Sequence, residues 1–433
     1  MINPMLTPWF VAAVPLLGAL LGLSIWSQPE KLKTWSVTVT LGSLLAVLLS
    51  FFTLTGSTEG LLFVLLLPLA ASVSLLGQPV HRDHRLTWVV TLVFLGMGLG
   101  ILTLPSPIGS IALALLLGFI TFLLYWHHDP FWGPSWLGIG TYGLGTLCAG
   151  IAAMTGSAIA SLLACMILLP LVPFHHGYVA ALTRLPGSLP SFTVLLLPAI
   201  GLHKLAALIP PVSELETLPV IVLALSGALY AAIKALAQSR VRLLLAYGSL
   251  SFFSLLWWCV AASRTVTPQA AVFLGSLALV TAGLLLAWQV IRTRYGDDVD
   301  PRAISGLAAQ MPQFAVLISV LALAAMGLPP FGVFVGFMGL LFASPLTLSI
   351  APFVVAITWL AASWYILDLV QGLLFGRKRP DLRYEDVRQS EFASLLIVVM
   401  IMFALGLAPT NLFEGTPRST DTGAIMESVS WNR

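Results

Sequence analysis

Long apolar stretches, separated by short polar segments, run along almost the whole chain of 433 residues. A helix that crosses a bilayer needs about 20 predominantly apolar residues, and most of these stretches reach or approach that length. The pattern therefore predicts an all-α polytopic membrane protein with about fourteen transmembrane helices. The predicted spans cover residues 8–27, 36–55, 60–77, 87–104, 109–126, 135–154, 157–175, 191–209, 217–233, 243–262, 270–291, 313–342, 348–374 and 392–408.

The twelfth span, within residues 301–342, is interrupted. Two apolar runs, FAVLISVLALAAM and VFVGFMGLLF, are each short for a membrane helix, and GLPPFG lies between them. Gly327, Pro329 and Pro330 therefore predict a helix that breaks at membrane depth. Proline removes a backbone donor, and carbonyls freed in the bilayer are tolerated only inside protein or beside a polar cavity. Discontinuous helices of this kind are where transporters tend to place their ion or substrate path.

Composition excludes several classes of protein. The chain is 58% hydrophobic and only 9% charged, which rules out an ordinary water-soluble globule. Cys148, Cys165 and Cys259 lie inside apolar runs without CxxC or Cys/His spacing, so we expect buried thiols, no metal site and no cofactor. No basic run alternates with aromatic residues, so nucleic acid is not an expected partner. The expected surroundings are a lipid bilayer.

The distribution of basic residues predicts the orientation. Sixteen of the 20 Lys and Arg residues lie in loops that follow odd-numbered spans. The loops after even-numbered spans and the tail hold only Arg264, Arg418 and Arg433. Because short cytoplasmic loops carry the excess of Lys and Arg, this alternation predicts that both termini face away from the cytoplasm. A multi-pass protein of the inner (cytoplasmic) membrane is expected.

Two charged residues fall within predicted spans. Lys204 lies in PAIGLHKLAALIPP and Asp368 in SWYILDLVQGLLF. A charge at the centre of a bilayer costs about 2.5 to 3.5 kcal/mol on insertion scales, so each is a candidate for an ion path. Alternatively, each side chain could reach towards an interface, since Lys204 precedes Pro210 by six residues and Asp368 precedes Gly376 by eight.

Three histidines are further candidates, because histidine is the side chain that titrates near neutral pH. His175 and His176 follow Pro170 and Pro173 in MILLPLVPFHHGY, where the seventh span bends or ends. His203 adjoins Lys204. Such groups could form a proton relay, although the histidine pair could equally be interfacial residues. The remaining histidines lie in loops without metal-ligand spacing and are interpreted as solvated residues: His81, His84, His127 and His128.

Several segments between residues 172 and 337 carry a resemblance to a known family. VPFHHGYVAALTRLPGS, LHKLAAL and VRLLLAYGSLS are followed by the pair GLAAQMP and GLPPFGVFVGF. The pair is similar to Gly-Leu-x-x-x-Met-Pro and Gly-Leu-Pro-x-x-Gly-Phe in antiporter-like membrane subunits of respiratory complex I. Mrp-type cation/proton antiporters, membrane-bound hydrogenases and the membrane partner of energy-coupled inorganic-carbon transporters share this family. The chain is identified as a divergent member.

The resemblance implies two inverted five-helix repeats, spans 4–8 and 9–13, in which the fourth helix of each, span 7 or span 12, is broken. The expected organisation is then an N-terminal three-helix region at 1–86, a first repeat at 87–209, a second repeat at 217–374, and a last helix with a short polar tail at 392–433. Family members move protons through a central row of charged residues in spans 5, 7, 8 and 12.

The chain departs from that row of charges. The segment LALLLGFITFLLYW in the fifth span has no carboxylate. Leu168 stands where the family has a lysine in span 7, and Phe337 stands where it has a charged residue after the break in span 12. Lys204 matches the lysine of span 8. Three of the four charges are therefore replaced by apolar residues.

Two functions of different class follow. In the first, the protein is a subunit of a multi-subunit energy-coupling complex and takes part in proton or monovalent-cation translocation. The path would then involve Lys204, His203, His175, His176 and Asp368. In the second, it is a degenerate, non-pumping subunit with a structural or coupling role. Either way we expect other membrane subunits as partners, and any enzyme activity would belong to the complex.

Overall fold

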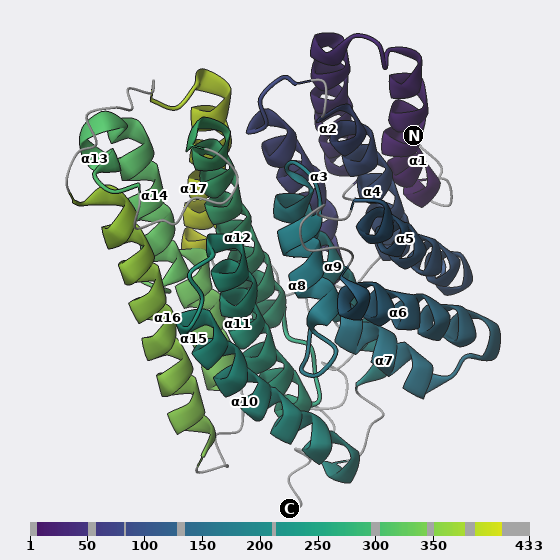
Figure 1. Ribbon diagram of the computed structural model, residues 1–433. Coiled ribbons are helices and arrows are strands. Elements are labelled where there is room, and N and C mark those ends of the chain that lie inside the picture. The colour runs from purple at the N-terminus through teal and green to yellow at the C-terminus, as the bar shows by residue number, and fades with distance from the viewer. Residues whose placement is uncertain are drawn as a thin grey trace, which may run out of the picture.

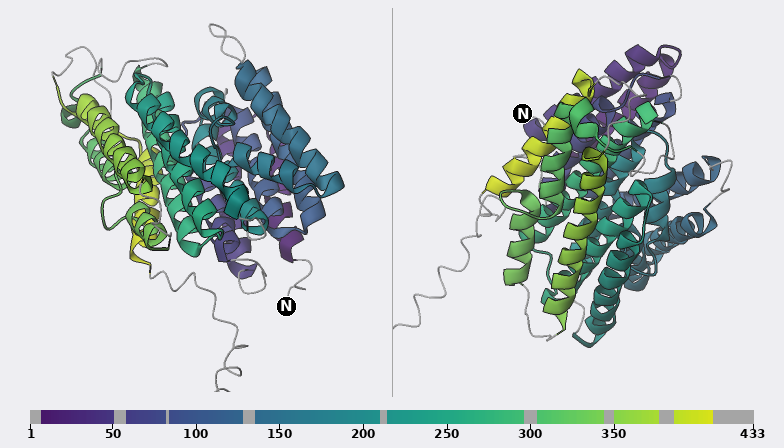
Figure 2. Two further views of the ribbon diagram at one scale, coloured as in Figure 1. Left: turned by 90° about the horizontal axis from the view of Figure 1, so that it is seen from below. Right: turned by 60° about the vertical axis from the view of Figure 1, so that its left-hand side comes forward.

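The computed structural model describes residues 7–50, 58–81, 84–127, 135–209, 214–295, 304–343, 350–376 and 386–408. Within these ranges every regular element is a helix (Figure 1). Helices α1 to α7, purple to blue, lie towards the right of Figure 1, α8 and α9, teal, lie near its centre, and most of the later helices, up to yellow, lie towards the left. Figure 2 shows the same division from below and from the side. Both termini and the predicted polar tail lie outside the described residues.

The helices follow one another with short connections. Their bounds are α1 Thr7–Ser24, α2 Pro29–Ser50, α3 Thr58–Leu76, α4 Arg85–Thr103, α5 Ser106–Trp126, α6 Trp136–Thr155, α7 Ala158–Leu168, α8 His176–Arg184, α9 Leu189–Leu208, α10 Glu214–Leu236, α11 Val241–Ser263, α12 Pro268–Tyr295, α13 Leu307–Gln310, α14 Pro312–Ala325, α15 Gly332–Ala343, α16 Ala351–Leu374 and α17 Gln389–Leu407.

Eleven of the described helices are long and apolar enough to cross a membrane. The shorter apolar helices are α3, α7, α14 and α15, and they fall where the third, seventh and twelfth spans are predicted. The largest difference from the predicted bounds is in the seventh span, which is predicted to end at residue 175 although α8 follows the break and extends to Arg184. Helix α2 also differs, since it begins at Pro29 although the prediction starts at residue 36. Proline is favoured in the first turn of a helix, and long lysine side chains there can extend towards water. The polar start of α2 is therefore compatible with a membrane helix.

Helix α12 occupies the centre of the second half. Its most apolar stretch is completely buried in the protein. It packs against α3, α9, α11, α14, α15 and α17, so it contacts helices from both halves of the chain. A helix that is apolar on every side has no polar face for water to solvate, and burial among other helices is the expected outcome. Around α12 the two halves form one continuous apolar core.

The seventh predicted span is broken as expected. Helix α7 ends at Leu168, and α8 resumes at His176, with Pro170 and Pro173 in the segment between them. The interruption frees the carbonyl of Leu169, and the indole N–H of Trp257 on α11 donates to it at 2.9 Å. Both groups are buried. A side chain from the other half of the chain thus satisfies a backbone group that could find no water at this depth.

The twelfth predicted span is also broken, between α14 and α15. Gly327 has φ +69°. Its N–H donates to the carbonyl of Ala324 at 3.0 Å, and the N–H of Leu328 donates to the carbonyl of Leu323 at 3.2 Å. This pair of bonds is the Schellman motif, which favours glycine in the left-handed region. A Cβ at Gly327 would also collide with the ring of Trp359. Pro329 and Pro330 follow, and they cannot continue the helix.

The hydrogen bond from Trp257 gives a first prediction. Trp257→Phe keeps a buried ring but leaves the Leu169 carbonyl without its donor, so we expect a loss of about 1 to 3 kcal/mol in stability. The neighbouring Trp258 is the matched control, because its indole N–H is buried without a partner among the described residues. Thermal unfolding in detergent should therefore show a lower Tm for Trp257→Phe than for Trp258→Phe. Equal Tm values would contradict the assigned role of Trp257.

Candidate functional site

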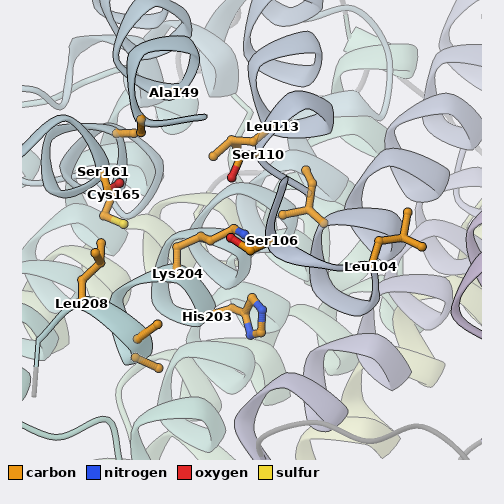
Figure 3. A pocket seen from close by; sticks show the side chains of 15 residues that line it. Leu104, Ser106, Ser110, Leu113, Ala149, Ser161, Cys165, His203, Lys204 and Leu208 are labelled. Carbon is orange, nitrogen blue, oxygen red and sulfur yellow. The ribbon is translucent and has the colours of Figure 1, made fainter. Parts of the chain in front are cut away.

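A cavity of about 450 Å³ lies in the first half of the chain, between α4, α5, α6, α7 and α9 (Figure 3). It forms where α4, α6 and α9 end and where α5 and α7 begin, so it lies towards one end of the helices. Its lining combines small and polar side chains with leucines. The lining residues are Ile101, Leu104, Ser106, Ser110, Leu113, Ala149, Ala152, Ser161, Ala164, Cys165, His203, Lys204, Ala206, Ala207 and Leu208.

Lys204 provides the charge in this cavity. Its half-buried side chain extends from α9 towards the start of α5 (Figure 3). The Lys204 Nζ atom comes close to Gly109, since a Cβ at that position would be in ordinary van der Waals contact with it at 3.5 Å. Ser106 and Ser110 on the same helix also line the cavity, and none of the described lining residues is acidic. The site therefore offers one amine and several hydroxyl groups in a space large enough for water.

Two of the five predicted path residues, His203 and Lys204, line this cavity together. His175 and His176 lie elsewhere, at the break between α7 and α8. Asp368 lies on α16 in the second half, on a part of the helix surface that the protein leaves exposed. The structure therefore does not gather the five residues at one site.

The histidine pair belongs to a second cluster. The ring centroids of His175 and His176 are 4.2 Å apart, and His175 is only 2% exposed. Tyr230 on α10 and Tyr247 on α11 approach His175, with centroid distances of 5.6 and 6.1 Å. Lys234 lies over the Tyr230 ring at 5.9 Å. The cluster extends from the break towards the end of the molecule where α10 joins α11.

Apolar residues separate the two clusters. Leu168, Leu169 and Leu171 are completely buried at the end of α7 and in the break. Helix α9 packs tightly here, since a Cβ added to Gly201 would lie 2.6 Å from the backbone nitrogen of Leu169. Protons move between groups that water or hydrogen bonds can bridge, and the side chains of this leucine seal (Leu168, Leu169 and Leu171) offer no polar atom to such a bridge. The polar groups of the first half are thus divided into two parts.

Aromatic rings pack together in the second half of the chain, around Phe337. Phe337 is 3% exposed, and its ring centroid lies 4.4 Å from that of Trp359 and 5.6 Å from that of Phe273. Phe252 completes the aromatic cluster through contacts with Trp359 at 5.6 Å and Phe273 at 6.3 Å. The four rings come from α11, α12, α15 and α16. The contacts among these four rings are apolar, and none of the four side chains can carry a charge at neutral pH.

Sequence reasoning missed several members of these clusters. Tyr230 and the serines of α5 had no recognisable signal, because a single Tyr or Ser in an apolar helix is common. Tyr247 was within reach, since it lies in the segment VRLLLAYGSLS that carries part of the family resemblance. In the part of the chain that the structure describes, no three His, Cys, Asp or Glu side chains gather as a metal ion would require.

A family model described as "NADH:quinone oxidoreductase/Mrp antiporter, TM" matches residues 102–362. NADH-quinone oxidoreductase subunit M of Escherichia coli (strain K12) is 26% identical over 275 residues, which are 61% of this chain and 52% of the relative. The F(420)H(2) dehydrogenase subunit M of Methanosarcina mazei is 27% identical over 258 residues, or 57% of this chain and 51% of the relative. The chain spans about half the length of the curated relatives it matches.

Solved structures resemble the fold over nearly the whole chain. A chain of respiratory complex I from Thermus thermophilus with bound NADH matches with a TM-score of 0.76 and 20% identity, covering 93% of this chain and 95% of that one. A chain of the Mrp complex from Dietzia sp. DQ12-45-1b matches with a TM-score of 0.78 and 18% identity, covering 96% of each chain. At these identities the likeness concerns the fold alone.

The division between cavity and leucine seal predicts a difference in water access. In a variant whose three cysteines are replaced by alanine, Ser110→Cys should react with a hydrophilic thiol reagent at least about ten times faster than Leu168→Cys. The reason is that a reactive thiolate forms only where water reaches the sulfur. Labelling rates in intact membrane vesicles provide the measurement. Comparable rates at the two positions would show that the leucine seal is hydrated.

Proposed function

Because the chain belongs to the NADH:quinone oxidoreductase/Mrp antiporter transmembrane family, we propose that it is an antiporter-like subunit of a multi-subunit energy-coupling membrane complex. In this role it takes part in proton or cation translocation through its first half. The observation that carries the proposal is the cavity around Lys204, which holds a basic side chain among small polar groups within the membrane-spanning region. Resemblance to chains of respiratory complex I and of an Mrp complex supports the assembly.

We further propose that the chain crosses the membrane fourteen times. Eleven crossings are the long helices, the twelfth is α3, and the other two are the broken helices α7–α8 and α14–α15. Two inverted repeats, at 87–209 and 217–374, would follow an N-terminal region at 1–86 and precede a last helix and tail at 392–433. Matching contacts support the repeats. The first and last helices of each proposed repeat pack together, as α4 with α9 and α10 with α16. The third helix of each contacts both parts of the broken helix, as α6 contacts α7 and α8 and as α12 contacts α14 and α15. Each proposed repeat also carries its break in the fourth helix.

The proposed orientation in the inner membrane has both termini on the non-cytoplasmic side, following the excess of Lys and Arg in alternate loops. The Lys204 cavity then opens towards the non-cytoplasmic side, because it lies where α4, α6 and α9 end. The His175 cluster extends towards the cytoplasmic side, where α10 joins α11. Two half-paths would meet at the leucine seal, and translocation would require water to enter this segment transiently.

A second candidate function is a non-pumping subunit that supports or couples its neighbours. The leucine seal and the aromatic cluster favour it, because together they close the central region in both halves of the chain. In this case Lys204 and the histidine pair would be remnants of an ancestral path. The two candidates share the fold and the assembly and differ only in whether protons cross this chain.

The second break supports the presence of neighbouring membrane subunits. Leu328, Pro329 and Pro330 are exposed on the surface of the chain, and helices of 14 and 12 residues flank the break, which puts it near mid-membrane. Irregular backbone at this depth is tolerated where protein covers it or where it lines a water-filled cavity. We propose that another membrane subunit of the complex packs over this break.

The two candidate functions predict different effects of Lys204→Met. If the first is correct, coupled proton uptake by proteoliposomes that hold the whole complex should fall by about 100-fold, because a positioned acid–base group is lost. Lys204→Arg should lower proton uptake to a similar extent, since arginine keeps the charge but does not release its proton. Lys31→Met, at an exposed position in α2, is the control. Unchanged uptake in an assembled Lys204→Met complex would establish the non-pumping function.

A further inference from the structure

A second cavity, of about 360 Å³, lies at the opposite end of the helices from Lys204. It forms where α5, α8 and α12 end and where α4 and α11 begin, so helices from both halves of the chain enclose it. Its volume falls within the range of small-molecule sites, about 300 to 1,000 Å³. Its described lining residues are His84, His127, Thr183, Arg184, Leu185, Pro186, Gly187, Arg242, Gln289 and Arg292.

The charge of this cavity is strongly one-sided. Arg184, Arg242 and Arg292 come from three different helices, and His84 and His127 add two groups that can carry a positive charge. None of the ten described lining residues is acidic. An anion that enters the cavity would meet several of these groups at once, and its attraction to them is stronger where protein replaces water.

Two of the guanidinium groups are directed to the same point. Arg242 Nη2 donates to Gln289 Oε1 at 3.2 Å, and Arg292 Nη1 approaches the same oxygen at 3.5 Å. The other arm of Arg242 donates to the carbonyl of Thr183 at 3.0 Å. Gln289 is 9% exposed, so its amide is a buried anchor. These bonds fix the Arg242 fork in place before any ligand binds, which lowers the cost of binding.

We propose that this arginine cavity binds the phosphate group of an anionic phospholipid. The planar guanidinium fork matches phosphate oxygens with two parallel hydrogen bonds, and several arginines together can neutralise a phosphate diester. The cavity lies at the ends of membrane-spanning helices, on the side where the basic loops gather. Anionic headgroups are available there, and basic pockets between transmembrane helices are suited to them.

The bound phosphate would also connect the two halves of the chain. Arg184 ends α8 in the first half, whereas Arg242 begins α11 and Arg292 lies near the end of α12 in the second. A single anion shared by these side chains would hold α8 against α11 and α12 at this end of the molecule. This role is independent of whether protons cross the chain, so it stands apart from the proposed function.

Native mass spectrometry of the full-length protein in detergent, with added phosphatidylglycerol, tests the proposal. Wild type should bind one phosphatidylglycerol more tightly than phosphatidylcholine. Affinity should fall about five-fold for each arginine removed in Arg242→Gln and Arg292→Gln, and about 25-fold in the double variant. Arg240→Gln is the matched control, since Arg240 is exposed two residues away and does not line the cavity. It should bind phosphatidylglycerol as wild type does.

Further measurements separate the possible sources of phosphate and protect the test from misfolding. Binding of inorganic phosphate with no preference for the lipid would keep the phosphate site but assign it to a soluble anion. Equal affinity of wild type and the double variant would overturn the proposal. The proposal would also be overturned if the isolated chain bound phosphatidylglycerol but the assembled complex did not, because an acidic group of a partner subunit would then fill the cavity. If the double variant does not fold, wild-type affinity must still weaken steeply with salt.

Discussion

The structure depends on burying one helix completely. Helix α12 is apolar around its whole circumference and packs against helices from both halves of the chain. Lipid would solvate such a helix as well as protein does, so close packing must hold it in place. Gly275, Gly283 and the facing Gly336 serve this purpose, because a Cβ at any of them would press on a neighbouring helix. Six of the other described helices, from both halves of the chain, pack around α12.

The same membrane environment decides how the chain can be interrupted. Two helices break at membrane depth, and each break is satisfied differently: an indole from the opposite half caps Leu169, while the second break closes its own carbonyls through the glycine turn at Gly327. The first solution joins the two halves, and the second is local. The first break also lies beside two titratable side chains, those of His175 and His176.

Chemically the two halves of the chain are unequal. The first half retains Lys204 in a cavity and a histidine–tyrosine cluster, separated by the leucine seal. The second half is filled by the aromatic cluster around Phe337. The proposed proton path uses the first half, where the leucine seal lies between its two polar clusters. The arginine cavity at the other end is lined by residues from both halves.

The sequence determined what local chemistry controls. Apolar stretches of membrane length predicted the helices, prolines and Gly327 predicted both breaks, and the motifs around Lys204 and Phe337 predicted the family. Each of these signals lies within one short segment. What the tertiary structure alone decided was which side chains meet. It divided the five candidate path residues among three places, brought Tyr230 and Tyr247 to His175, and joined Arg184, Arg242 and Arg292 around one cavity. Those contacts arise between helices far apart in the chain, and no local pattern encodes which faces of two apolar helices will touch.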